Sequence, residues 1–378
     1  MSPCRILIVG GGVGGTLVAN LLARRLKPEE AQVTLLSQDA EHHYQPGWLY
    51  VAVDDMEETD LRRPEKALLE QEVFFIHDAA ERFDLERRRV WTRSGEVLPY
   101  DWLVIATGSQ LDLERIPGLQ EGAHHFYSLV GARNLQYALR AFRGGRVVIG
   151  IGGMPFKCPV APLEFTFLLD VYLRRRGLRG QTELVYTFPI GRCFPIESVA
   201  ELAQRHLDER GIRTELFFDI EGIDPERRVI FGMSGDLAYD LAVIIPPHRG
   251  AEAVLRSGIG DDEGWIPTDR YTLQLEGVEG VWVIGDATNI PISKAGSTAH
   301  YQARVVADRI VAQIRGQEPT ARYDGHVQCF LELGDGKATL LDFDYEHPPE
   351  PPRPTRFYHL AKKLFNRAYW YLIPTGRV

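Results

Sequence analysis

Long apolar runs are missing from this 378-residue sequence, and none approaches the roughly 18 residues that a membrane-spanning helix needs. Cysteine is scarce, with 4 residues, and no basic, apolar leader precedes the first apolar segment. We therefore expect a protein of the cytoplasmic side whose cysteines are thiols or redox centres rather than a disulfide framework. The composition, 44% hydrophobic and 25% charged, excludes a disordered chain. The length predicts two domains, or one large domain with an appendage.

Acidic residues are missing from the last 28 residues, which carry six Lys or Arg side chains. Residues 1–350 carry all 52 acidic side chains and 37 basic ones, a net charge of −15. An acidic body argues against nucleic acid as the main partner, because it repels phosphates. The basic tail therefore needs an explanation of its own.

Glycine is concentrated in a turn near the N-terminus. An apolar segment, residues 5–9, leads into Gly10, Gly12 and Gly15 in G-x-G-x-x-G spacing, and a helical pattern over 16–26 follows. The first glycine permits the tight turn, the second lets the backbone approach a pyrophosphate, and the third lets helix and strand pack closely. The free N–H groups of the helix N-terminus then face the phosphates. The sequence therefore predicts a dinucleotide-binding site here.

The acidic residue that usually closes the second strand of such a unit, where it binds a ribose, is missing. Ser37 stands at the end of the predicted strand 32–37, and Asp39 follows it. Either the Ser37 hydroxyl or the Asp39 carboxylate can take this contact.

Two later segments complete the pattern. The strand 102–107 runs into Thr107-Gly108, and a strand that begins at residue 281 ends in Gly285-Asp286. Together with the glycine turn, these segments resemble the flavoproteins that have two dinucleotide-binding domains. The resemblance implies FAD as the cofactor, with Asp286 on its ribityl chain.

A second α/β unit lies in the middle of the chain. Its predicted elements are a strand over 147–150, a helix over 162–176, a strand over 183–187 and a helix over 198–211. Pro155 occupies the third glycine position of the turn, and the next strand ends in Tyr186-Thr187-Phe188 without an acid, so nicotinamide binding is disfavoured. The rebuilt turn instead carries Cys158, and we expect the neighbouring Lys157 to stabilise a thiolate there.

Three motifs identify the family that the chain resembles. They are Phe156-Lys157-Cys158-Pro159-x-Ala161-Pro162-x-Glu164, then Gly285-Asp286-Ala287-Thr288-Asn289-x-Pro291-x-Ser293-Lys294-Ala295-Gly296, then Cys329-Phe330-x-Glu332. These motifs resemble those of sulfide:quinone oxidoreductases, from the first strand to the C-terminal helix. The resemblance implies oxidation of hydrogen sulfide to zero-valent sulfur or polysulfide by FAD and two redox cysteines, with electrons passed to a membrane quinone.

The resemblance also implies roles for individual residues. Sulfide attacks a disulfide or sulfur-bridged form of Cys158 and Cys329, and the thiolate that reacts with the flavin is assigned to Cys329. Glu164 is either the local acid/base or a helix N-terminal acid, with equal weight. Lys294 and the helix that opens at Gly296 stabilise negative charge on the reduced flavin.

A third cysteine that many members of this family carry is not where the resemblance would place it. Tyr127 and Ser128 occupy that stretch, so covalent attachment of FAD there is not available. Cys193 is a weaker candidate for the same role, and the sequence leaves it open.

The expected fold class is α/β, with two Rossmann-like domains followed by a C-terminal hairpin and an amphipathic membrane-binding helix. The predicted limits are 1–112 and 246–316 for the two parts of the FAD-binding domain, 113–245 for the second Rossmann-like domain and 317–378 for the C-terminal region. The hairpin is predicted over 327–332 and 338–343, with a proline-rich linker after it.

The terminal segment 356–373 has a helical apolar stripe, with basic residues on its other faces. The stripe comprises Phe357, Leu360, Leu364, Ala368 and Tyr371/Leu372. We expect the segment to bind the membrane surface without crossing it, with Lys362, Lys363 and Arg367 drawn to anionic lipid. Its aromatic residues suit the headgroup boundary, among them Tyr369 and Trp370. The alternative is a helix docked on the acidic body or on a partner chain.

Three other interpretations share these motifs. They are a type II NADH:quinone oxidoreductase, the flavoprotein subunit of a flavocytochrome c sulfide dehydrogenase, and a flavin-bearing interaction module or redox sensor. The broken second glycine motif argues against the first. The sequence predicts no metal site, and it leaves open the quinone type, the length of the sulfur product and whether the chain forms a homo-oligomer.

Overall fold

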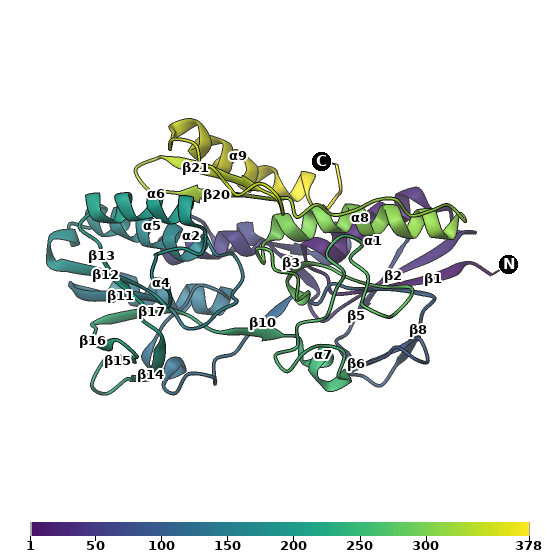
Figure 1. Cartoon of the computed structure of the whole chain (residues 1–378), viewed down its shortest axis with the longest axis horizontal. Helices are drawn as coiled ribbons and strands as arrows, with labels where there is room; N and C mark the ends of the chain where they lie inside the picture. The colour runs from purple at the N-terminus through teal and green to yellow at the C-terminus, as the bar shows by residue number, and fades with distance from the viewer. Residues whose placement is uncertain (1, 378) are drawn as a thin grey trace.

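The computed structural model describes residues 2–377, and its two lobes are each built on a parallel sheet (Figure 1). In the first sheet the order is β19 (Val281–Val283), β9 (Trp102–Ile105), β1 (Cys4–Val9), β2 (Ala31–Ser37) and β5 (Val73–His77). In the second it is β13 (Arg213–Leu216), β12 (Thr182–Phe188), β11 (Gly145–Ile151) and β17 (Leu241–Ile245). The central strands are almost continuous buried runs of Val, Ile and Leu, as parallel strands covered on both faces require.

The helices and the smaller strands complete the two lobes. The helices are α1 (Val13–Arg25), α2 (Trp48–Ala52), α3 (Leu119–Gly122), α4 (Leu129–Ala141), α5 (Ala161–Arg175), α6 (Glu197–Glu209), α7 (Glu252–Ser257) and α8 (Gly296–Ile314). Three-stranded meanders flank the sheets, namely β6 (Ala80–Asp84), β7 (Arg89–Thr92) and β8 (Val97–Pro99), and β14 (Ile220–Asp224), β15 (Val229–Gly232) and β16 (Gly235–Ala238). Two short antiparallel pairs join β3 (Glu41–His43) to β4 (Arg62–Pro64), and β10 (Ser109–Leu111) to β18 (His248–Gly250).

The predicted α/β fold with two Rossmann-like sheets is confirmed. The first sheet takes strands from before and after the second sheet in the sequence, because β19 pairs with β9. The main difference from the sequence prediction is that α1 begins at Val13 rather than at residue 16, since Gly14 and Gly15 belong to its first turn. The domain limits given above stay a prediction.

The C-terminal region lies across both lobes, at the top of Figure 1. Strands β20 (Val327–Glu332) and β21 (Ala338–Phe343) form the hairpin with the limits that the sequence predicts, and α9 spans Arg356–Leu372. Among residues 2–377, no helix combines the length and the apolar character needed to pass through a bilayer.

Helix α9 turns its apolar stripe away from the protein. Phe357, Leu360, Leu364 and Tyr371 are between 66% and 72% exposed, and they are the greater part of the stripe that the sequence analysis singled out. The buried face carries Lys362, Asn366, Tyr369 and Trp370 instead. The expectation that Lys362, Tyr369 and Trp370 face lipid is therefore wrong, because all three pack into the protein.

A layer of buried polar contacts holds α9 in this orientation. The Tyr369 hydroxyl lies 2.7 Å from Nε2 of His42, whose side chain is fully buried against the carboxylate of Glu65. Tyr44 donates a hydrogen bond of 2.6 Å to Oδ1 of Asn366. Because buried polar groups are costly unless they are paired, these contacts fix which face of the helix points inward.

A second polar cluster fixes the tip of the hairpin. The buried carboxylate of Asp170 on α5 accepts hydrogen bonds from Arg174 at 2.9 Å, Arg179 at 2.6 Å and Arg210 at 2.8 Å. Arg210 also donates to the carbonyl oxygen of Leu333, at 2.7 Å. The hairpin is thereby tied to the second lobe.

This cluster makes Asp170 a stability-determining residue. Asp170→Ala leaves three arginines without their shared carboxylate, so it should lower the free energy of unfolding by about 3–5 kcal/mol. Asp308→Ala, which removes an exposed ion pair with Arg25, should cost no more than about 1 kcal/mol. Urea unfolding of both variants measures the difference. Equal effects of the two substitutions would contradict a structural role for the Asp170 cluster.

Candidate active site

The three glycines of the motif are required for different structural reasons. A Cβ atom on Gly10, where φ is +115°, would lie 2.2 Å from the carbonyl oxygen of Ala106, and one on Gly15 would lie 1.8 Å from that of Gly10. A Cβ atom on Gly12 would meet no atom of residues 2–377 within 4 Å. Gly10 and Gly15 are therefore required by the fold, whereas Gly12 leaves space open in front of the turn.

That space belongs to a cavity of about 640 Å³ that reaches both lobes and α9. With the exception of Gly15, every residue that the sequence analysis placed in the site lines it. These residues are Gly10, Gly12, Ser37, Asp39, Thr107, Gly108, Cys158, Glu164, Gly285, Asp286, Lys294, Gly296 and Cys329. Gly15 packs against the backbone of Gly10 and the side chain of Ala106, just beyond the ends of β1 and β9.

Two helix N-termini open onto the cavity. Gly12 precedes α1 and Ala295 precedes α8, and both line the cavity wall. Among the described residues, no side chain caps either helix, and neither first turn contains an acid. The hydroxyl of Thr107 is also buried and has no hydrogen-bond partner in the described part of the chain. Free N–H groups at helix N-termini bind phosphates, so the wall fits a ligand with a pyrophosphate.

At the far end of this wall, Ser37 and Asp39 share a turn. The Ser37 hydroxyl donates to the carbonyl oxygen of Asp39 at 2.9 Å and accepts from its N–H at 3.3 Å. The Ser37 side chain is thus already engaged, whereas Asp39 is exposed. Of the two candidates for a ribose contact, Asp39 has the carboxylate that remains available.

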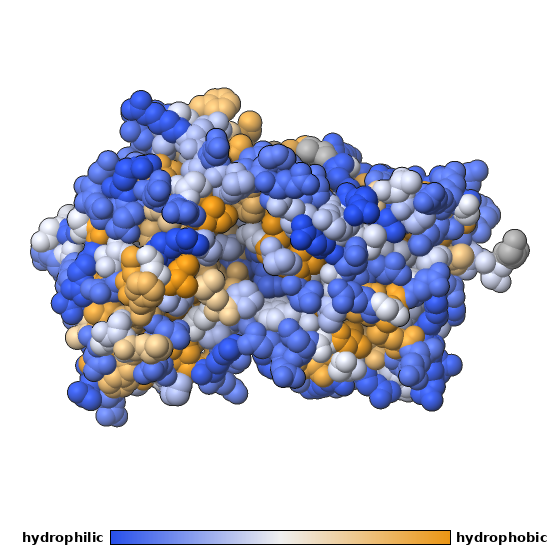
Figure 2. All heavy atoms as spheres, in the orientation of Figure 1, coloured by the Kyte–Doolittle hydropathy of each residue, from blue (hydrophilic) through white to orange (hydrophobic). Residues whose placement is uncertain are grey.

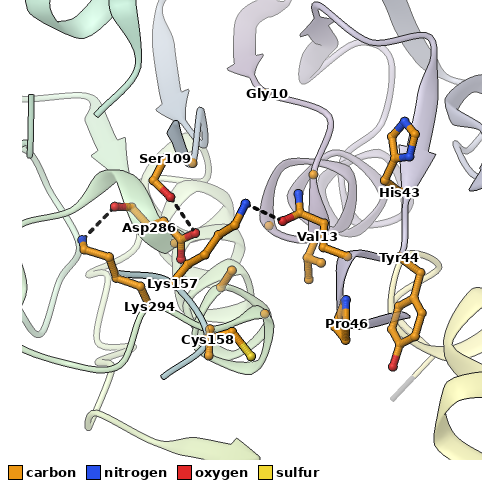
Figure 3. Close-up of a pocket in the computed structure, with 18 of the residues that line it drawn as sticks. Gly10, Val13, His43, Tyr44, Pro46, Ser109, Lys157, Cys158, Asp286 and Lys294 are labelled. Carbon is orange, nitrogen blue, oxygen red and sulfur yellow. Dashed lines mark hydrogen bonds between the residues drawn. The ribbon is translucent and has the colours of Figure 1, made fainter. Parts of the chain in front are cut away.

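At the other end, Asp286 and Lys294 lie together (Figure 3). Asp286 accepts a hydrogen bond of 3.2 Å from Ser109. The Lys294 ammonium donates to the carbonyl oxygens of Asp286 and Thr288, at 2.9 and 2.8 Å, and lies 3.9 Å from the ring centroid of Trp265. Burial lowers the pKa of Lys294 to about 8, against the opposing effect of Asp286. A cation is therefore held beside the cavity, although its role toward a ligand stays a prediction.

The loop 152–160, between β11 and α5, brings Cys158 to the cavity instead of forming a second phosphate cradle. Cys158 has φ +50°, a left-handed conformation that costs energy for a residue with a side chain. Three contacts hold it there. Its N–H donates to the carbonyl oxygen of Lys294 at 2.6 Å, while its own carbonyl accepts from the Tyr127 hydroxyl at 3.2 Å and from the Ala161 N–H at 2.9 Å.

The expectation that Lys157 stabilises a Cys158 thiolate stays a prediction, because Cys158 raises the pKa of Lys157 while burial lowers it more strongly. The Lys157 side chain reaches across the cavity (Figure 3), where its ammonium donates to Oε1 of Gln45 at 2.9 Å and lies 5.4 Å from the Trp48 ring centroid. Burial, with smaller contributions from the neighbouring Cys329 and Glu164, raises the pKa of Cys158 to about 12. In its reduced form Cys158 is therefore a thiol near neutral pH.

Cys329 faces the same cavity from the hairpin, where it pairs with Leu341. Its sulfur lies 3.8 Å from the Ser297 hydroxyl, in the first turn of α8. Burial raises its pKa to about 11 in spite of the Ser297 hydroxyl and Lys362, which lower it, and Glu164 adds to the rise. Two sulfur atoms from segments 171 residues apart in the sequence thus share one cavity.

Glu164 is buried in the first turn of α5, and its carboxylate has two partners. The Tyr50 hydroxyl donates to it at 2.8 Å, and the ammonium of Lys362 on α9 forms an ion pair with it. Burial raises the pKa of Glu164 in spite of Lys362. Both interpretations of Glu164 thus stay open, because it starts a helix and also lines the cavity beside Cys158.

Sequence reasoning missed Lys362, Tyr50 and Ser297. Nothing in the sequence signals the Glu164–Lys362 pair, because 198 residues separate its members.

Cys193 lies apart from the site: its buried thiol donates to the carbonyl oxygen of Ala200 at 3.3 Å, and it does not line the described cavity.

Known proteins share this architecture. A model of the pyridine nucleotide-disulphide oxidoreductase family matches residues 4–304. The mitochondrial sulfide:quinone oxidoreductase of Mus musculus is 28% identical, over 91% of this chain and 79% of the relative. The solved structure of the sulfide:quinone oxidoreductase from Aquifex aeolicus has a TM-score of 0.89 at 24% identity and covers 99% of this chain and 92% of that one. A type II NADH:quinone oxidoreductase of Staphylococcus aureus is 23% identical, over 89% of this chain and 90% of the relative.

The glycine geometry predicts that two substitutions in one turn have different effects. Gly12→Val should leave the fold intact, since φ is −92° and the side chain enters the cavity, but should abolish binding of the flavin dinucleotide. Gly15→Val should prevent correct folding, because its Cβ meets backbone. Flavin absorbance after purification and the melting temperatures of the apoproteins test this. A Gly12→Val protein with a full complement of flavin would show that the cofactor does not lie against this turn.

Proposed function

The chain belongs to the pyridine nucleotide-disulphide oxidoreductase family, and on this basis we propose that it is an FAD-dependent enzyme that oxidises sulfide and passes the electrons to a quinone. The observation that carries this proposal is the placement of Cys158 and Cys329 on the cavity that the dinucleotide turn also lines. The named activity of the Mus musculus relative supports the same assignment.

The residues of the first lobe fit FAD. The turn at Gly12 and the start of α1 would hold the pyrophosphate, Asp39 the ribose of the adenosine part, and Asp286 the ribityl chain. When bound, FAD accepts two electrons from the cysteine pair and makes them available to the quinone. Lys294 and the N-terminus of α8 would place positive charge near the isoalloxazine ring.

The cysteines would carry the sulfur chemistry. Starting from the oxidised pair, hydrosulfide forms a new S–S bond with Cys158 while the bond between Cys158 and Cys329 breaks, so that Cys329 leaves as a thiolate. Two electrons would then leave the pair as the Cys329 thiolate forms a new S–S bond with the outer sulfur of the Cys158 persulfide, which releases the persulfide proton and leaves a sulfur-bridged pair. Glu164, with its raised pKa, is the group beside Cys158 that can bind the released proton.

The part of the cavity below α9 suits a quinone. Phe330 of the hairpin and Phe365, Leu372 and Ile373 of the C-terminal segment line it, together with Tyr44. Aromatic and aliphatic walls with a few polar groups are typical of sites for flat apolar ligands. A quinone that enters from the membrane would reach the cofactor along this apolar side.

The type II NADH:quinone oxidoreductase alternative is weaker. In the second lobe the loop 152–160 carries Pro155 and Cys158 where a nicotinamide-binding unit needs a glycine cradle. Bleaching of the flavin by NADH, without sulfide, would favour this alternative.

We further propose that α9 attaches the protein to a membrane surface. Its apolar stripe is exposed while its polar face is buried, and Lys363 and Arg367 are exposed beside the stripe. Hydrophobic atoms protrude over the start of α9 at the top of Figure 2. A helix with such faces lies in the membrane interface. The side of the membrane stays a prediction, and so does the oligomeric state.

Serine substitutions test the cysteine chemistry. Cys158→Ser and Cys329→Ser should retain FAD, because neither residue lies in the phosphate or ribityl segments, but should lose flavin reduction by sulfide, because a hydroxyl cannot replace the thiolate. Cys193→Ser is the matched control and should keep the activity. Anaerobic sulfide titration of the flavin spectrum, followed by a soluble quinone, measures both steps. Wild-type turnover in either site variant would refute the two-cysteine mechanism.

The membrane assignment predicts the effect of two substitutions on the exposed stripe. Leu360→Ser combined with Leu364→Ser should weaken binding to anionic vesicles at least tenfold, since each leucine contributes about 2 kcal/mol when it leaves water. Flavin reduction by sulfide should be unchanged. Val130→Ser removes an equally exposed side chain, 65% exposed on α4, and should have no effect. Vesicle flotation at low salt compares the three proteins, and a wild-type protein that stays in solution contradicts the assignment.

A further inference from the structure

Helix α1, which begins in the dinucleotide turn (residues 10–15), buries two polar side chains. Thr16 and Asn20 are fully buried, whereas every other buried residue of α1 is glycine or apolar. Four residues apart on one helix, the two side chains lie on the same face. Because a buried polar group is costly unless it is paired, their partners identify the segments on which the position of α1 depends.

The partners of Asn20 come from two segments that are distant from α1 in the sequence. Its amide nitrogen donates to the carbonyl oxygens of Leu68 and Pro374, at 2.8 and 2.7 Å. Its side-chain oxygen accepts from the N–H of Glu70 at 2.8 Å. Pro374 lies just after α9, so one buried side chain joins the dinucleotide helix to the end of the chain across 354 residues.

Thr16 reaches α9 through two more buried side chains. Its hydroxyl donates a hydrogen bond of 2.6 Å to Oε1 of Glu65. The other Glu65 oxygen lies 3.1 Å from Nδ1 of His42, and Nε2 of His42 lies 2.7 Å from the Tyr369 hydroxyl. Glu65 also lies beneath the dinucleotide turn, because a Cβ atom on Gly11 would be 3.3 Å from its carboxylate carbon. This chain of contacts therefore runs from the turn to α9 through buried side chains only.

The end of the chain also packs directly against α1. A Cβ atom on Gly376, where φ is +62°, would lie 3.0 Å from Cδ1 of Leu17 and 3.1 Å from Cδ2 of Leu21. The polar contacts of α1 reach the same stretch, residues 369–376, which we call the end segment. Ile373 of this segment also lines the cavity. The end segment therefore touches both the helix that starts the dinucleotide site and the cavity itself.

We propose that the end segment positions α1 for cofactor binding, so that FAD is held tightly only while residues 369–376 are docked. The residues of the contact chain are positioning residues, because they act through α1 and the dinucleotide turn rather than on the cofactor itself. The inference rests on the proposed function only in taking FAD as the ligand. Since coupling between two sites is reciprocal, bound FAD should in turn hold the end segment on the protein. The position of α9 and the retention of the cofactor then depend on the same docked chain end.

A substitution at the chain end tests this without altering the sheets. Gly376→Val should push the end segment away from α1, because its Cβ meets Leu17 and Leu21, and should raise the dissociation constant of FAD at least tenfold. Gly211→Val is the matched control, since φ is again +62° but its Cβ would meet no atom of residues 2–377 within 4 Å. It should leave the affinity for FAD unchanged. Titration of the full-length apoproteins with FAD, followed by flavin fluorescence, measures the constants.

A second substitution, on the other link, removes a single hydroxyl. Tyr369→Phe keeps the ring and breaks the contact with His42, so it should weaken FAD binding severalfold, since one hydrogen bond is lost. Tyr371→Phe makes the same change two residues further along α9, where the ring is exposed, and should have no effect. Melting temperatures of the apoproteins check that the four variants are folded.

Hydrogen exchange measures the reciprocal effect. FAD should slow the exchange of backbone amides in peptides that cover residues 369–376 of the wild type, and should slow it less in Gly376→Val. Peptides from α6, in the second lobe, serve as the reference. A purely structural role of the end segment would lower the melting temperature of the variants but leave the segment equally protected with and without FAD.

Two results would overturn the inference. One is an unchanged affinity for FAD in both Gly376→Val and Tyr369→Phe, and the other is equal exchange of the end segment with and without FAD. Neither measurement uses sulfide or a quinone. A wild-type protein that binds FAD but whose flavin sulfide does not reduce would contradict the proposed function and leave the inference standing, whereas a chain that binds no FAD would contradict both.

Discussion

The structure depends on the layer of buried polar contacts beneath α9. A helix with an apolar stripe normally buries that stripe, because removing apolar area from water is the main favourable term in folding. Here the buried side chains of His42, Tyr44 and Glu164 have their partners on α9, in Tyr369, Asn366 and Lys362. A buried polar group that loses its partner costs more than an exposed leucine. The orientation of α9 follows from this requirement. The apolar face of α9 is then left exposed. Its buried polar face adds Lys362 to the wall of the cavity that holds the two cysteines.

The sequence was sufficient for the parts that local chemistry decides. The glycine spacing predicted the first turn, short apolar runs predicted the strands of the sheets, and the hairpin limits were correct to the residue. The residues of the cavity were also found, because motif positions at the carboxyl ends of parallel strands converge on one edge. The sequence could not predict which side chains from distant segments contact one another. Lys362 carried the signal of a surface residue on an amphipathic helix, and Lys157 was adjacent to Cys158 in the chain but points away from it.

Burial explains why the position of Lys157 next to Cys158 in the sequence does not by itself set the pKa of the thiol. A cation beside a cysteine in the sequence stabilises a thiolate only when the two groups share the same low-dielectric environment and lie close in space. Cys158 lies in a loop that is held by backbone hydrogen bonds to Lys294 and Ala161. The charges that act on its sulfur come from Cys329 on the hairpin, from Glu164 on the next helix and from Lys362 on α9. Tertiary structure, rather than the local motif, therefore sets the reactivity of both thiols.

The second lobe shows how the same fold can exchange one electron donor for another. In a nicotinamide-binding unit, the turn after the first strand places phosphates against a helix N-terminus, and the hydride donor enters from that side. In this chain the turn is replaced by the nine residues 152–160, α5 begins only at Ala161, and the segment between them delivers a sulfur atom to the cavity. The sheet behind the loop is still the parallel sheet that a nicotinamide-binding unit has. Because the second sheet keeps its buried core with this loop in place, one connection is enough to replace a phosphate cradle by a cysteine.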